Sequence, residues 1–169
     1  MAGNGKLSFM IQDLPDGKAS KDVSLGLGEL DLGENSLLEA RVEFNFHKTQ
    51  WFVDVSFSVN AVVKRQCQRS LKWFETSVES SYHVTYSSEF THEEIDYSGG
   101  KKPFPNPDDP VTLDAEVRDS IVLELPIRPL HPDFIDENGQ IKPFSTQTFG
   151  DTELETSVDP RWQALKHLK

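Results

Sequence analysis

An alternation of apolar and polar residues with period two runs through the middle of the chain. It begins with apolar side chains at Leu38, Ala40, Val42, Phe44 and Phe46. After Lys48-Thr49-Gln50, which is short enough for a hairpin turn, it resumes at Trp51, Val53, Val55, Phe57, Val59, Ala61 and Val63. A third run contains Val78, Ser80, Tyr82, Val84 and Tyr86. Period two is typical of strands with one buried face, and three such strands with short connections predict an antiparallel meander.

Shorter signals precede and follow this region. Residues 7–11 and 23–25 each predict a short strand, with turn-rich segments between and after them. A helix is expected to begin near Asp109-Pro110 and to end at Pro126. Its apolar stripe is Leu113, Val117, Ile121 and Leu125.

A second helix is expected at the carboxyl end of the sequence. Asp159 can cap it, Pro160 fits its first turn, and Trp162, Leu165 and Leu168 form its apolar stripe. Residues 91–110 and 127–158 are polar, rich in proline or irregular, and we expect mobile loops there. The expected fold is α+β and mainly antiparallel β. It is a long-stranded meander or a partly closed barrel, with a central and a carboxyl-terminal helix, in one domain over residues 1–169.

The charge is uneven along the chain. The net charge is -11, but residues 1–73 are neutral, and residues 74–100 hold six acids and no base. This balance argues against general affinity for nucleic acid, which needs a positive surface. A local basic patch is compatible with it, and the acidic middle could attract a basic protein or serve only solubility.

The amino-terminal residues and the single cysteine favour a reducing compartment. The first six residues lack the apolar core of a secretory signal, and no apolar run approaches the length of a membrane-spanning helix. One cysteine cannot form an internal disulfide. We therefore expect a cytoplasmic protein.

Motifs for metal binding and catalysis are incomplete. Cys67 is followed three residues later by Ser70, so the pair of thiolates that zinc usually takes is missing. The sequence His92-Glu93-Glu94-Ile95-Asp96 lacks the second histidine of a metalloprotease motif. Cys67 has basic neighbours that would lower its pKa, but its position in the alternation favours a packed thiol over a nucleophile. We expect no catalytic residue, metal, cofactor or small-molecule substrate.

Three segments, in this order, resemble the YceD family. Cys67-Gln68-Arg69-Ser70-Leu71 is similar to its C-x-R-C-L signature, and residues 121–126 are similar to its helix that ends in L-x-L-P. Residues 159–166 are similar to its closing D-P-R-x-x-x-L-K. The matching positions are Cys67, Arg69, Leu71, Pro126, Asp159, Pro160 and Arg161. Ser70 departs from the signature, and the stretch after Pro126 lacks the cysteines of many relatives, so a metal role is not expected.

The resemblance implies a ribosome-biogenesis factor that supports accumulation of the large-subunit ribosomal RNA. The segment 64–72 has four bases and no acid, so we expect it to contact RNA or a pre-ribosomal particle. The expected contacts are Lys64, Arg65, Arg69, Lys72, Arg161 and Lys166. The alternatives are an ordinary solvated strand end here, an acidic chaperone-like partner of a basic ribosomal protein, a small-ligand-binding β-barrel, or an enzyme whose site only the fold would bring together.

Overall fold

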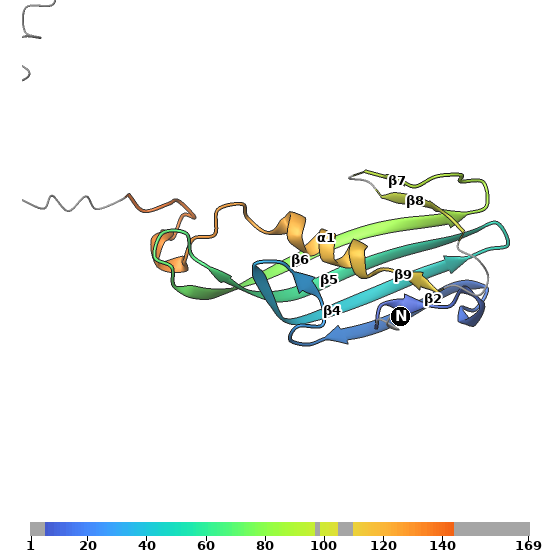
Figure 1. Ribbon diagram of the computed structural model, residues 1–169, viewed down its shortest axis with the longest axis horizontal. Coiled ribbons are helices and arrows are strands. Elements are labelled where there is room, and N and C mark those ends of the chain that lie inside the picture. Colours follow the sequence, from blue (N-terminus) through green and yellow to red (C-terminus); the bar gives the residue numbers. More distant parts are fainter. Residues whose placement is uncertain (1–5, 97–98, 105–109, 144–169) are drawn as a thin grey trace, which may run out of the picture.

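The computed structural model describes residues 6–96, 99–104 and 110–143, and three long strands dominate it (Figure 1). These are β4 (Asn35–Lys48), β5 (Phe52–Gln66) and β6 (Trp73–Ser87). They pair antiparallel in the order of the chain. The predicted meander is therefore confirmed.

Shorter strands extend this sheet on both sides. β2 (Gly17–Leu25) pairs with β4, and β3 (Asp31–Leu32) pairs with the beginning of β4. On the other side, β8 (Gly100–Pro103) runs parallel to the end of β6, and β7 (Glu94–Ile95) pairs with β8. The order along the sheet is β2-β4-β5-β6-β8-β7, and its two edges do not pair with each other. The sheet is open, which decides between the two expected forms in favour of the meander.

A second layer covers one face of the sheet. β1 (Ser8–Phe9) pairs with β9 (Val111–Thr112), and α1 (Asp114–Glu124) follows directly and lies along β6 (Figure 1). A 3-10 turn at Ile11–Asp13 follows β1, and a second one occurs at Pro132–Phe134. No helix in the described part of the chain is long and apolar enough to cross a membrane.

The core lies between these two layers and follows the predicted alternation. The aromatic ring of Phe9 meets the rings of Phe44 and Phe46 edge-on, with centroids 5.0 and 5.2 Å apart. Two details differ from the prediction. A bulge after Leu37 turns that side chain inward, and Leu38 is only half-buried. Trp51 lies in the turn and is 66% exposed.

The predicted helix is real, but it begins at Asp114 and not near Asp109-Pro110. Val111 and Thr112 pair with β1 as a strand, and the Leu113 amide donates to the main-chain oxygen of Leu7 over 3.1 Å. The chain can turn into a helix only after this pairing ends. The expected apolar stripe is buried along its whole length, from Leu113 to Leu125.

Two further predictions concerned the loop at residues 91–110 and the carboxyl-terminal helix. Residues 91–110, expected as a loop, contain the short strands β7 and β8, whose polar sequences carry no alternation. The expected carboxyl-terminal helix lies outside the described residues.

Candidate nucleic-acid interface

The basic segment forms the hairpin that joins β5 to β6. The amide of Cys67 donates to the main-chain oxygen of Lys72, and the amide of Leu71 donates to that of Cys67, both over 2.9 Å. Leu71 has a φ of 59° and is 67% exposed. A bulky residue in the left-handed region is strained, so the loop holds this side chain outward at a cost. We refer to residues 64–73 as the hairpin tip.

The chain after α1 wraps around the hairpin tip (Figure 1). The Gln68 amide donates to the main-chain oxygen of Pro129 over 3.0 Å. The His131 amide lies 3.2 Å from the sulfur of Cys67 and donates to it. We refer to residues 126–143 as the wrapping segment. The segments around Cys67 and Pro126, both singled out in the sequence, therefore meet at one place.

The buried side chain of Arg65 connects the hairpin tip to the wrapping segment. Its Nε donates to Oδ1 of Asn35 over 3.0 Å, and its Nη2 donates to the main-chain oxygen of Pro126 over 2.8 Å. The residue is only 6% exposed, and burial lowers the pKa of its guanidinium. Although the sequence suggested a surface contact, this side chain faces the protein.

Arg69 binds the wrapping segment from outside. Its two terminal nitrogens donate to the main-chain oxygens of Lys142 and Pro143, over 2.9 and 3.3 Å. Its guanidinium also lies 4.5 Å from the centroid of the Phe134 ring. These contacts hold the segment on the tip and leave the half-buried guanidinium little freedom to reach a partner.

Cys67 is fully buried, as the alternation predicted. Burial raises the pKa of its thiol, but hydrogen bonds from the Ser70 hydroxyl and from the amides of His131, Ser70 and Arg69 outweigh it and lower the pKa to about 7. No group of three or more histidine, cysteine, aspartate or glutamate residues within the described ranges could hold a metal ion.

Lys64, Lys72 and Trp73 remain on the open surface of the tip. Both lysines are exposed, and Trp73 is 51% exposed. Lys64 Nζ lies 5.7 Å from the centroid of the Trp73 ring. Sequence reasoning missed Trp73, although it directly follows the basic run. Arg161 and Lys166, as well as Asp159 and Pro160, lie outside the described residues.

A shallow hollow of about 380 Å³ lies beside these side chains. Its lining consists of Lys64, Trp73, Phe74, Glu75, His131 and Pro132. Both the hairpin and the wrapping segment contribute, so the hollow exists only because the two are held together. An aromatic ring, a lysine and a histidine around an open depression suit a flat, anionic ligand such as a nucleotide, while Glu75 adds a negative charge to one part of the lining.

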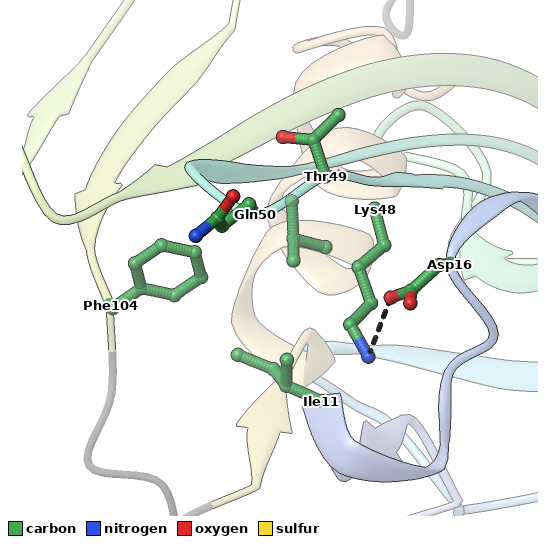
Figure 2. A pocket seen from close by; sticks show the side chains of 7 residues that line it. Ile11, Asp16, Lys48, Thr49, Gln50 and Phe104 are labelled. Carbon is green, nitrogen blue, oxygen red and sulfur yellow. Dashed lines mark ion pairs between the residues drawn. The ribbon is translucent and has the colours of Figure 1, made fainter.

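The opposite end of the long strands differs in charge and in shape. The acids of residues 89–96 are exposed there, and Glu93 and Glu94 form ion pairs with Lys102 and Lys101. A hollow of about 600 Å³ lies at this end, next to the β4–β5 turn (Figure 2). Lys48 lines it but is held by the main-chain oxygen of Leu14 at 2.8 Å and by Asp16 at 3.5 Å. Since the sheet is open, this hollow is not the interior of a barrel.

Comparison with known families identifies the group to which the chain belongs. The profile described as "Large ribosomal RNA subunit accumulation protein YceD" matches residues 55–169. No curated protein matches the chain, and no solved structure does. The matched region includes most of β5, the hairpin tip, α1 and the wrapping segment, and it exceeds half of the chain. The chain therefore belongs to the YceD family, whose name links it to accumulation of the large-subunit ribosomal RNA.

Proposed function

We propose that this protein is a non-enzymatic ribosome-biogenesis factor that binds ribosomal RNA, or a pre-ribosomal particle, through its hairpin tip. The observation that carries the proposal is the exposed Trp73, which directly follows Lys72 and lies beside Lys64, in a protein with a net charge of -11. Such a role belongs in the cytoplasm. The family name supports a role connected with ribosomal RNA, and the residues of the hairpin tip support the manner of binding.

The chemistry of the tip suits unpaired RNA. A base can stack on an exposed aromatic ring, which contributes about 1–3 kcal/mol per base. Lysine ammonium groups attract the phosphates on either side. Bases in a duplex are already stacked, so this arrangement favours loops, bulges or strand ends of the RNA.

The expected contacts divide into two groups in this proposal. Lys64 and Lys72 meet the RNA, and Arg161 and Lys166 stay as predicted contacts. Arg65 and Arg69 instead shape the tip, because their donors are engaged with main-chain oxygens of the wrapping segment.

Two matched tryptophan variants test the stacking. Trp51 is exposed to a similar degree, 66% against 51%, but it lies at the other end of β5. We expect Trp73→Ala to weaken binding of an unpaired large-subunit RNA fragment by about tenfold, and Trp51→Ala to leave it unchanged. Equal affinities of both variants and the parent chain would refute stacking on Trp73.

A second candidate function is binding of a basic ribosomal protein. Residues 74–100 carry six acids and no base, and those at 75, 79, 89, 93, 94 and 96 are exposed. Purification of the partner from growing cells separates the two candidates. A protein partner that persists after nuclease treatment favours this one, and loss of the partner favours RNA.

A further inference from the structure

Within the described part of the chain, the edge of β6 is unpaired over most of its length. β8 pairs only with Val84–Ser87. Over Trp73–His83, β6 pairs with β5 on one side, and no other described strand pairs with it on the other. Unpaired main-chain groups on a long strand edge are a template for another strand.

The register shows which residues present these groups. The hydrogen bond from the Cys67 amide to the Lys72 oxygen marks a bonded pair, and bonded pairs recur every second residue along an antiparallel ladder. Even-numbered residues of β6 therefore bond to β5, and odd-numbered residues point to the edge. The oxygen of Ser87 fits this parity, because it accepts from Phe104 on that side.

The side chains at the open edge are exposed and acidic or neutral. The odd-numbered residues are Trp73, Glu75, Ser77, Glu79 and Ser81, and all are exposed. The segment contains no proline and no lysine, which are the usual means of blocking an edge. β2, at the far side of the sheet, carries Lys18 and Lys21. Lysine side chains therefore protect the β2 edge against pairing with another strand, whereas the β6 edge lacks them.

Charge selects the occupant. A second copy of β6 on this edge would bring Glu75 and Glu79 of both chains together, within molecules that each carry a net charge of -11. A strand with lysine or arginine at alternate positions would instead place cations beside these carboxylates, and cross-strand pairs of opposite charge are favourable.

We propose that the edge of β6 between Trp73 and Ser81 binds an extended, basic peptide segment, which adds to the sheet as a further strand. The main chain supplies the affinity, and Glu75 and Glu79 select positive side chains. This rests on the second candidate function and gives it a docking site. The edge borders the hairpin tip, because Trp73 and Glu75 also line the hollow there.

Substitution of an edge residue by proline tests the pairing. Ser77→Pro removes an amide that faces the edge and leaves the bonds to β5 in place, whereas Ser77→Ala keeps the amide. The probe is a labelled nine-residue peptide of alternating lysine and valine, measured by fluorescence anisotropy. We expect the proline variant to bind it at least about tenfold more weakly than the alanine variant. Equal affinity of the two variants would overturn the proposal.

Two control peptides separate strand addition from simple attraction. A peptide of alternating lysine and proline has the same charge but cannot pair, and one of alternating glutamate and valine can pair but has the wrong charge. Neither should bind. The double substitution Glu75→Lys with Glu79→Lys reverses the charge of the edge, so it should reverse the preference between the lysine and glutamate peptides. This experiment tests the proposal even if Ser77→Pro does not fold.

Amide hydrogen exchange gives the sharpest readout. In the free chain, the amides of Glu75, Ser77, Glu79 and Ser81 should exchange fast and their even-numbered neighbours slowly. The lysine-valine peptide should slow the odd-numbered amides alone. If the odd-numbered amides are already slow in the free chain, or if they stay fast with the peptide bound, the edge is not the docking site.

Discussion

Nη2 of Arg65 lies 2.8 Å from the main-chain oxygen of Pro126 and donates to it. This bond joins the end of β5 to the chain just after α1, which ends at Glu124. It fixes the wrapping segment over the hairpin tip, so that the surface around Trp73 has one shape.

Removal of the Arg65 side chain should destabilise the fold. Arg65→Ala deletes the bonds to Asn35 and Pro126, and it should lower the free energy of unfolding by about 2–3 kcal/mol. Lys64→Ala, next in sequence but exposed, should change it by less than about 0.5 kcal/mol. Urea denaturation measures both. Equal effects of the two substitutions would contradict a structural role for Arg65.

Glycine at position 71 should stabilise the protein. Leu71 has a φ of 59°, which glycine adopts without strain, so Leu71→Gly should raise the free energy of unfolding by about 0.5–1 kcal/mol. Leu27 is exposed to a similar degree without a positive φ, and Leu27→Gly should lower it. The same denaturation series decides. A loss of stability in Leu71→Gly would show that the leucine side chain makes a contact worth more than the strain.

The thiol of Cys67 should titrate near neutrality. Its pKa is about 7 because the hydrogen bonds from Ser70 and the neighbouring amides outweigh burial. Ultraviolet absorbance of the thiolate measures this directly, since the chain has one cysteine. Ser70→Ala should raise the midpoint. A midpoint at the ordinary value of about 8.5 in the parent chain would contradict these hydrogen bonds.

The same lowered pKa predicts how stability depends on pH. The folded chain releases the thiol proton at lower pH than the unfolded chain, so the unfolded chain binds more protons between pH 7 and about 8.5. The stability from this group is fully present above that range, and it is lost as the pH falls towards 7. Cys67→Ser should lack this rise when unfolding is measured at both ends of the range.

An ion pair between Glu116 and Lys102 joins α1 to β8. Glu116 Oε1 lies 2.5 Å from Lys102 Nζ, and both side chains are largely buried. Burial lowers the pKa of Lys102, but the hydrogen bond and charge of Glu116 outweigh it, and the pKa is raised. Glu116→Gln should cost about 2–3 kcal/mol at neutral pH, because Lys102 would lose its nearer carboxylate and keep only Glu93, at 3.8 Å. The exposed pair of Arg118 and Asp119 is the control, and Asp119→Asn should be nearly neutral.

The sign of the pH dependence checks this pair further. A raised lysine pKa gives stability that is present below the ordinary value of about 10.4 and is lost as the pH rises through the folded value. The difference between the parent chain and Glu116→Gln should therefore shrink at strongly alkaline pH. A constant difference would mean that the substitution acts by packing alone.

Most of the fold could be predicted from the sequence. Each of the three long strands has one buried face, and the alternation of apolar and polar residues indicates which face that is. Val42, Val55 and Val84 lie where period two places them. The bulge after Leu37 was not readable, since it shifts the pattern by one residue at a strand end. Trp51 keeps the parity of the buried face, but it lies in the turn before β5 and is exposed. β9 was hidden because Val111 and Thr112 pair with a distant strand.

The candidate site was readable only in part. The basic run marked the right place, but the roles within it depend on contacts with residues some sixty to seventy positions away. Arg65 has the parity of the buried face, which could have removed it from the surface set. The sequence contains no comparable pattern that would have predicted the exposure of Trp73 at the start of β6.

A salt series on RNA binding tests the central claim most directly. Lys64→Ala with Lys72→Ala removes two positive charges from the tip, and Lys18→Ala with Lys21→Ala removes two exposed ones from β2. With an unpaired large-subunit RNA fragment, the tip pair should reduce the slope of log affinity against log salt by about 1.4, and the β2 pair should leave it unchanged. Equal slopes for both variants would contradict binding through the hairpin tip.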